Sequence, residues 1–174
     1  LSGADTPAFD TIALSGARTS MPHGVPGNRK IMRGDLVLVD FGAKVDGYHS
    51  DCTRTFSAGL PNSRQKDAYR RVYRAYITAR NRVRPGIKGD VPWRAAHKSL
   101  GGWGKYFIHG LGHGVGLEIH EAPSMSESSS DVIRAGQFVT VEPGIYIPGW
   151  GGIRLEDTVV VSSRGAIPVT GLLS

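Results

Sequence analysis

Four carboxylates stand at matching places in two similar stretches of the sequence. Residues 31–42 align without gaps on residues 133–144, and each stretch has a turn, an apolar β-branched run, a carboxylate and a glycine. A second strand-like run with another carboxylate follows each stretch. In chain order these residues are Asp40, Asp51, Glu142 and Glu156. Because short apolar runs bounded by turn residues predict strands, we expect the chain to form the same acidic hairpin twice.

The first acidic hairpin has a strong turn signal in the dipeptide Asp46-Gly47. A two-residue turn at this point places Asp40 opposite Thr53. Asp40 and Asp51 then lie on the same face as diagonal neighbours, within about 7–8 Å of each other. The first hairpin is therefore expected to direct two carboxylates into one space.

The second hairpin turns through residues 148–152, a longer loop that fixes its register less well. Glu142 and Glu156 can again share a face. Four carboxylates that face one space repel each other strongly unless a positive charge lies between them. The hairpins therefore predict a cation site.

Three histidines lie between the acidic hairpins, in a glycine-rich stretch: His109, His113 and His120. One histidine here would more often be structural, but three beside two acidic hairpins favour a metal site. Four carboxylates and one neutral imidazole carry a charge of −4, which two divalent ions cancel. This ligand set suits Mn²⁺, Co²⁺, Fe²⁺ or Zn²⁺ better than Ca²⁺. Two such ions about 3.5–4 Å apart can share a hydroxide and polarise a carbonyl group.

Two helices are expected between the hairpins. Asn62 is a plausible cap for the first, whose apolar face has helical spacing and which Pro85-Gly86 should end. The residues of that face are Val72, Ala75, Tyr76, Ala79 and Val83. A shorter helix is predicted over residues 91–100, with Asp90 as its cap.

Composition favours one domain with a hydrophobic core, because 40% of the 174 residues are hydrophobic. No run of about 18 apolar residues predicts a membrane span. The single cysteine, Cys52, excludes an internal disulfide and fits the reducing cytoplasm, where we expect the protein. Much of the net charge of +6 comes from the first helix. We interpret this charge as a solvated helix face rather than a nucleic-acid surface, because no nucleic-acid motif accompanies it.

The order Asp, Asp, His, Glu, Glu resembles the metal ligands of the pita-bread metallopeptidases, which include methionine aminopeptidase, aminopeptidase P and prolidase. The resemblance runs from about Phe9 to the end of the chain. It implies an α+β pita-bread fold, in which helices cover a pseudo-symmetric, curved antiparallel sheet. It also implies that the five ligands are Asp40, Asp51, His113, Glu142 and Glu156. Asp40 would bind one ion and His113 with Glu142 the other, while Asp51 and Glu156 would bridge them.

Further motifs are similar to those of the Xaa-Pro peptidases within this family. They are the run from His109 through His120-Glu121, the segment 142–146 and the segment 152–157. By this resemblance His109 would line the proline pocket, and His120 would hydrogen-bond the substrate carbonyl. His23 would lie near the scissile bond, Arg154 would brace the metal-site carboxylates, and Glu142 would also take the proton of the nucleophile.

The resemblance therefore implies a dinuclear-metal exopeptidase that hydrolyses Xaa-Pro dipeptides or short peptides through a metal-bridging hydroxide. The cofactors would be two divalent ions such as Mn, Co or Zn. An Xaa-Pro dipeptidase is slightly favoured over an aminopeptidase P. The alternatives are a methionine aminopeptidase, which usually lacks a histidine like His109, and a non-catalytic binding protein, which typically loses metal ligands.

The resemblance leaves part of the family's pattern unmatched. The family's first helices precede the segment that matches Phe9, and its Xaa-Pro members usually carry a separate N-terminal domain. We therefore expect residues 1–174 to be an N-terminally truncated catalytic domain from a longer chain that forms a homodimer. Apolar sheet surface would be exposed where the first helices are missing.

Overall fold

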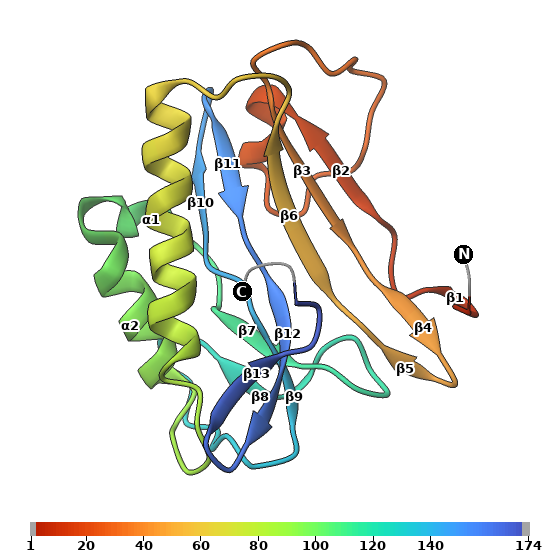
Figure 1. Ribbon diagram of the computed structural model, residues 1–174, viewed down its shortest axis with the longest axis vertical. Coiled ribbons are helices and arrows are strands. Elements are labelled where there is room, and N and C mark those ends of the chain that lie inside the picture. The colour runs from red at the N-terminus through yellow and green to blue at the C-terminus, as the bar shows by residue number, and fades with distance from the viewer. Residues whose placement is uncertain (1–2, 172–174) are drawn as a thin grey trace.

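The computed structural model describes residues 3–171, and its first half is built around the predicted acidic hairpin (Figure 1). Strands β3 (Leu36–Phe41) and β6 (Cys52–Ser57) pair antiparallel, and β2 (Ile12–Ser15) pairs with the other edge of β3. The hairpin continues into β4 (Ala43–Val45) and β5 (Tyr48–His49), and β1 (Thr6–Pro7) pairs with β4. A short 3₁₀ helix, η1 (Gly16–Ser20), follows β2.

The turn of the first hairpin has the predicted form. Asp46 and Gly47 have φ angles of 49° and 85°, which are the left-handed values of a type I′ turn. Asp40 lies opposite Thr53, so the register predicted from the turn is confirmed. Only glycine fits at position 42, because a Cβ atom there would overlap the carbonyl oxygen of Ser50.

The second half repeats this hairpin in a longer form. Strand β9 (Phe138–Val141) pairs with β12 (Asp157–Ser162), and β10 (Gly144–Ile147) pairs with β11 (Gly151–Arg154). The residue pairing of β9 with β12 continues without a shift into that of β10 with β11. Glu142 and Glu156, which lie between the two strand pairs, are therefore opposite each other. A sheet in the order β13-β12-β9-β7-β8 extends this half with β7 (Gly112–Gly114), β8 (Glu121–Met125) and β13 (Gly165–Pro168).

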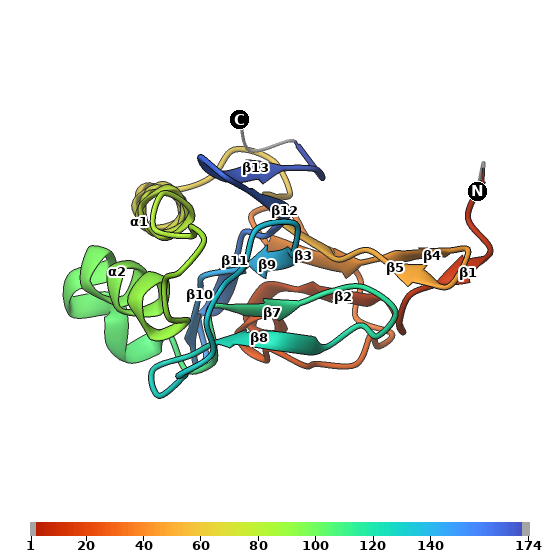
Figure 2. The ribbon, with the colours of Figure 1, turned by 90° about the horizontal axis from the view of Figure 1, so that it is seen from below.

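Two α-helices cover the second half and pack side by side against it (Figure 2). They are α1 (Ser63–Arg80) and α2 (Asp90–Leu100), and the 3₁₀ helix η2 (Gly101–Tyr106) follows α2. Val72 and Tyr76 of α1 lie in one buried core with Val139, Ile153 and Val159. No helix within residues 3–171 is long and apolar enough to cross a membrane.

The helix ends differ in part from the prediction. Asn62 caps α1, and its side chain and that of Gln65 form a reciprocal capping box. The predicted end at Pro85-Gly86 was wrong, because α1 ends at Arg80. The ring of Pro85 would clash with the carbonyl group four residues earlier if the helix continued. The helix therefore stops before that turn, although Val83 is still buried.

Asp90 is the first residue of α2 and not its cap, so that prediction was also wrong. Gly89 stands at the cap position, without a side chain that could accept a hydrogen bond. A Cβ atom at position 89 would overlap the carbonyl oxygen of Ser124. The close approach of β8 therefore requires glycine where a capping residue would otherwise fit.

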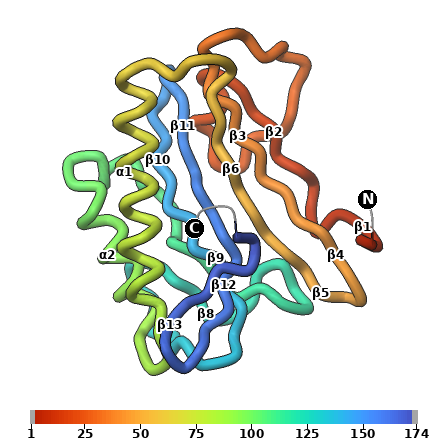
Figure 3. The backbone as a smooth tube through the Cα atoms, in the orientation of Figure 1, coloured from red at the N-terminus to blue at the C-terminus, as the bar shows by residue number. Residues whose placement is uncertain are grey.

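The two halves lie side by side (Figure 3) and are joined by side chains. Thr55 of β6 donates a hydrogen bond to the carbonyl oxygen of Arg154 at 2.9 Å and accepts one from its N–H at 3.1 Å. Thr19 of η1 accepts a hydrogen bond from the N–H of Gly152 at 2.7 Å. Hydroxyl groups thus replace part of a backbone ladder along this seam.

We predict that Gly112→Ala lowers the free energy of unfolding by about 1–3 kcal/mol, the usual cost of overpacking. A Cβ atom at position 112 would overlap the carbonyl oxygen of Thr140 on the neighbouring strand. Gly102→Ala is the matched control, because its Cβ atom would meet open space. Urea denaturation of both variants tests the prediction, and equal stability losses would contradict it.

Candidate metal centre and active site

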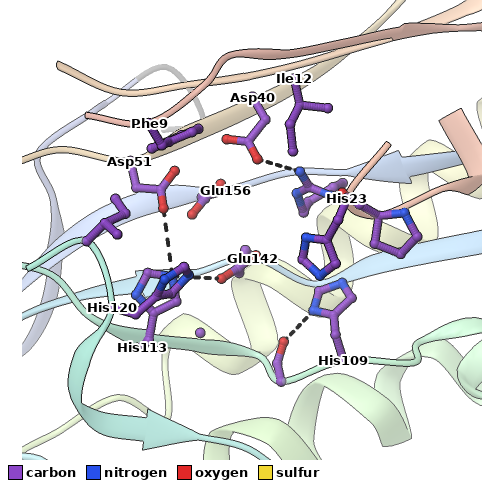
Figure 4. Close-up of a pocket in the computed structure, with 15 residues that line it drawn as sticks. Phe9, Ile12, His23, Asp40, Asp51, His109, His113, His120, Glu142 and Glu156 are labelled. Carbon is purple, nitrogen blue, oxygen red and sulfur yellow. Dashed lines mark hydrogen bonds and ion pairs between the residues drawn. The ribbon is translucent and has the colours of Figure 1, made fainter. Parts of the chain in front are cut away.

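Both acidic hairpins and the histidine stretch open onto one cavity of about 320 Å³ (Figure 4). Asp40 comes from β3, and Asp51 directly precedes β6. Glu142 and Glu156 come from the interval between the paired strands of the second half, and His113 comes from β7. The ligand residues predicted from the sequence are therefore brought together. The cavity is lined by these five residues and by Phe9, Ile12, Pro22, His23, His109, Gly110, Gly112, Ile119, His120 and Arg154.

The ligand atoms of the five residues lie within reach of shared cations. One carboxylate oxygen from each of Asp40, Asp51 and Glu156 lies within 4.8 Å of the other two. The Nε2 atom of His113 lies 3.4 Å from Oε1 of Glu142 and 3.7 Å from Oδ2 of Asp51. Such a cluster of oxygen and nitrogen ligands has the geometry to hold divalent ions.

Unpaired buried atoms show that the cluster fits a metal. Oδ1 of Asp40, Oδ1 of Asp51 and Oε1 of Glu156 are buried and have no hydrogen-bond partner among the described residues. A buried carboxylate oxygen without a partner costs about 1–3 kcal/mol or more. Three such oxygens in one cluster are therefore unfavourable unless a cation binds them.

The ring of His113 is oriented as a metal ligand. Its Nδ1 atom lies 3.0 Å from the carbonyl oxygen of Gly114, which can only accept a hydrogen bond, so Nδ1 carries the proton. The Nε2 atom then presents a lone pair to the carboxylates of Asp51 and Glu142. Burial lowers the pKa of His113 to about 4, so the ring is neutral at pH 7. These contacts are therefore lone pairs facing oxygens rather than salt bridges.

Without a cation three carboxyl groups of the cluster hold their protons more tightly than usual: Asp51, Glu142 and Glu156. Burial is the main cause that raises the pKa of Asp51 to about 8 and that of Glu142 to about 7. Burial, together with the charges of Glu142, Asp51 and Asp40, raises the pKa of Glu156 well above its usual range. A divalent ion that binds these groups must displace their protons, so metal binding is coupled to pH.

Arg154 is hydrogen-bonded to the carboxylate cluster and to its neighbours. Its buried guanidinium donates hydrogen bonds to Oδ2 of Asp40 at 2.6 Å, to Oγ1 of Thr53 at 3.0 Å and to Oη of Tyr146 at 2.9 Å. Thr53 in turn donates to Oε2 of Glu156 at 2.5 Å. The guanidinium of Arg154 therefore holds Asp40 directly and Glu156 through Thr53, one carboxylate from each hairpin. Hydrogen bonds of this kind orient the side chains that could bind a metal.

Thr140 is a site residue that sequence reasoning missed. Its hydroxyl group donates to Oε1 of Glu142 at 3.1 Å and accepts from the N–H of His113 at 3.0 Å. It therefore connects two proposed ligands of the same ion. Thr140 lies two residues before Glu142, a spacing that puts both side chains on one face of an extended chain, and this spacing was the available signal.

The remaining predicted histidines line the cavity. His109 lies with Nδ1 2.6 Å from the carbonyl oxygen of Gly110 and Nε2 2.9 Å from Oη of Tyr146. Burial lowers its pKa to about 4. The ring of His120 packs at 4.2 Å against that of His113, while His23 extends toward His109 from the other side (Figure 4). Their roles toward a substrate stay predictions.

We predict that the stability of the metal-free protein falls by about 1–3 kcal/mol per pH unit between about pH 6.5 and about pH 8. Folded Asp51 still binds a proton over most of this window and folded Glu142 in its lower part, whereas unfolded carboxyl groups have lost theirs. The folded state therefore binds more protons, so raising the pH favours unfolding. Urea denaturation after chelation measures the slope. A flat or rising dependence would contradict the assignment.

Known proteins resemble this chain in both sequence and fold. The Xaa-Pro dipeptidase of Pyrococcus furiosus is 46% identical over 98% of this chain and 49% of its own length. The solved structure of prolidase from Pyrococcus furiosus matches with a TM-score of 0.94 at 47% identity, over 97% of this chain and 50% of that one. The X-Pro aminopeptidase from Thermotoga maritima matches with a TM-score of 0.95 at 38% identity, over 98% and 49%.

These likenesses confirm the predicted pita-bread fold. The chain spans about half the length of the relatives it matches. The model of the metallopeptidase family M24 matches residues 1–163, which is most of the sequence. The chain therefore belongs to metallopeptidase family M24.

Proposed function

We propose that this chain carries the catalytic site of a dinuclear-metal exopeptidase that hydrolyses the Xaa-Pro bond of dipeptides or short peptides. The observation that carries the proposal is the cluster of three buried, unpartnered carboxylate oxygens facing one cavity. The relatives named Xaa-Pro dipeptidase and prolidase support the substrate class. The dipeptidase is favoured over the aminopeptidase because those relatives have the higher identity.

Five residues would hold two divalent ions: Asp40, Asp51, His113, Glu142 and Glu156. Asp40 would serve one ion, His113 and Glu142 the other, and Asp51 and Glu156 both. Two bound ions would supply a hydroxide nucleophile and polarise the scissile carbonyl group. Mn²⁺, Co²⁺ and Zn²⁺ all suit this set of oxygen and nitrogen ligands.

Glu142 is positioned to take the proton of the nucleophile. Thr140 holds its Oε1 atom, and no hydrogen bond among the described residues holds Oε2. The raised pKa of this carboxyl group, about 7, reflects a buried site in which a proton on oxygen is tolerated.

The histidines around the ligands would bind the substrate. His120 would donate a hydrogen bond to the scissile carbonyl oxygen, where negative charge develops. His109 is neutral, and both its ring nitrogens are already engaged. With the rings of Phe107 and Tyr146 beside it, His109 would form an apolar wall for the proline ring. His23 would contact the substrate near the scissile bond.

Three expectations about the protein in the cell remain proposals. We place it in the cytoplasm, because its single cysteine fits a reducing compartment. We also propose that the active enzyme is a homodimer of a longer chain, in which residues 1–174 form part of the catalytic domain.

We predict that the chelated protein regains peptidase activity when Mn²⁺, Co²⁺ or Zn²⁺ is added, with Ala-Pro cleaved best in a panel of three peptides. A longer Xaa-Pro peptide tests for an aminopeptidase P, and a Met-Ala peptide tests for a methionine aminopeptidase. Product release is measured by chromatography at equal substrate concentrations. No metal-dependent cleavage of any peptide would contradict the proposal and favour a non-catalytic binding protein.

We predict that Asp51→Asn removes both ions, because this residue would bridge them. Mutation of a residue that only hydrogen-bonds a metal ligand lowers activity about 10- to 100-fold. The loss of activity in Asp51→Asn should be larger than that. Glu118→Gln is the control, because Glu118 is an exposed carboxylate close to His120 in the sequence. Metal content measured by mass spectrometry should stay at two ions in the control. Two retained ions in Asp51→Asn would refute the bridging role.

A further inference from the structure

A buried arginine outside the cavity joins the two halves of the molecule directly behind the candidate metal centre. Arg54 lies in β6, where it alternates with Thr53 and Thr55 and therefore points to the opposite face of the strand. Its side chain is buried. None of the steps proposed for catalysis uses it.

One nitrogen of Arg54 connects the main chains of both hairpins. Nη1 donates to the carbonyl oxygen of Thr53 at 2.9 Å and to the carbonyl oxygen of Glu156. The N–H of Glu156 also donates to the carbonyl oxygen of Thr53 at 3.2 Å. Thr53 follows Asp51 by two residues. Arg54 thus holds the backbone next to both proposed bridging ligands.

The second nitrogen of Arg54 is held by a counterion that has further partners. Nη2 donates to Oδ1 of Asp157 at 2.7 Å, and Asp157 is fully buried. Asp157 also accepts hydrogen bonds from Tyr76 of α1 at 2.6 Å and from Thr170 at 2.8 Å. These hydrogen bonds satisfy both nitrogens at the tip of the guanidinium and both oxygens of Asp157, and only Nε of Arg54 has no partner among the described residues. The guanidinium is therefore fixed from the side away from the metal centre.

Arg54 and Asp157 occupy matching places in the two hairpins. Arg54 lies opposite Val39 and Asp157 lies opposite Val141, and Val39 and Val141 are equivalent in the internal repeat. The pair therefore joins the two copies to each other through residues of opposite charge. An ion pair whose sole role was to fill the core could be replaced by apolar side chains, often without loss of stability. Its contact with Glu156 indicates a more specific role.

We propose that Arg54 is a positioning residue that sets the distance between the Asp51 and Glu156 carboxylates before metal binds. Those buried carboxylates that are ionised repel one another and push the two hairpins apart, and the bonds from Arg54 to the carbonyl groups of Thr53 and Glu156 oppose this separation without a metal. The proposal rests on the proposed metal centre. Arg54 would thus affect metal affinity although it does not line the cavity.

The test compares Arg54→Lys with Tyr76→Phe. Lysine keeps the charge, but its single nitrogen cannot reproduce the fork, in which one nitrogen binds both carbonyl groups while the other binds Asp157. Tyr76→Phe damages the same network but leaves both of these bonds in place. Calorimetric titration with Mn²⁺ should show an affinity about 10- to 100-fold lower in Arg54→Lys. The affinity of Tyr76→Phe should match that of the parent protein. Equal affinities in both variants would overturn the proposal.

A measurement on the metal-free protein separates this inference from the proposed function. Arg54→Lys should speed hydrogen exchange of the Glu156 amide, which is bonded to Thr53. The amide of Ile133, bonded to the carbonyl oxygen of Ile87 at 2.9 Å, should be unaffected. Faster exchange at Glu156 alone would support the role of Arg54 in holding the two hairpins together, even if the parent protein bound no Mn²⁺ and the proposed function failed. An unchanged exchange rate of the Glu156 amide would overturn the proposed role of Arg54, whatever the metal titration gave.

Discussion

Repulsion among buried carboxylates is the constraint on which the rest of this structure depends. Asp40, Asp51, Glu142 and Glu156 converge on one cavity, and three of them have buried oxygens without partners. In a medium of low dielectric constant such charges strongly destabilise the folded state unless cations or protons balance them. The raised pKa values show how the metal-free site responds, by retaining protons.

The fold opposes this repulsion from several directions. Arg154 inside the cavity ties Asp40 to the second hairpin, and Thr53 ties Glu156 to the first. Thr55 closes the seam beside them through hydroxyl hydrogen bonds. Behind the site, we propose that Arg54 performs the same task. Such a scaffold would keep the ligands preorganised, so that binding of divalent ions costs little rearrangement.

The sequence predicted the local geometry of the site well. The turn at Asp46-Gly47 and the period of two along the strands were sufficient to place Asp40 opposite Thr53. The helix ends were harder, because they depend on other parts of the chain. Gly89 replaces a capping side chain only because the carbonyl oxygen of Ser124 lies against it. Thr140 and Arg54 were missed for a similar reason, since each is identified by a partner that lies far away in the sequence.

The most direct test of this account is the number and position of metal ions in the protein. Crystals grown with Mn²⁺ and measured at its absorption edge should show two anomalous peaks about 3.5–4 Å apart. Both peaks should lie between Asp51 and Glu156, with His113 bound to one of the ions only. No peak at this cluster, or Mn²⁺ bound only elsewhere on the molecule, would contradict the account.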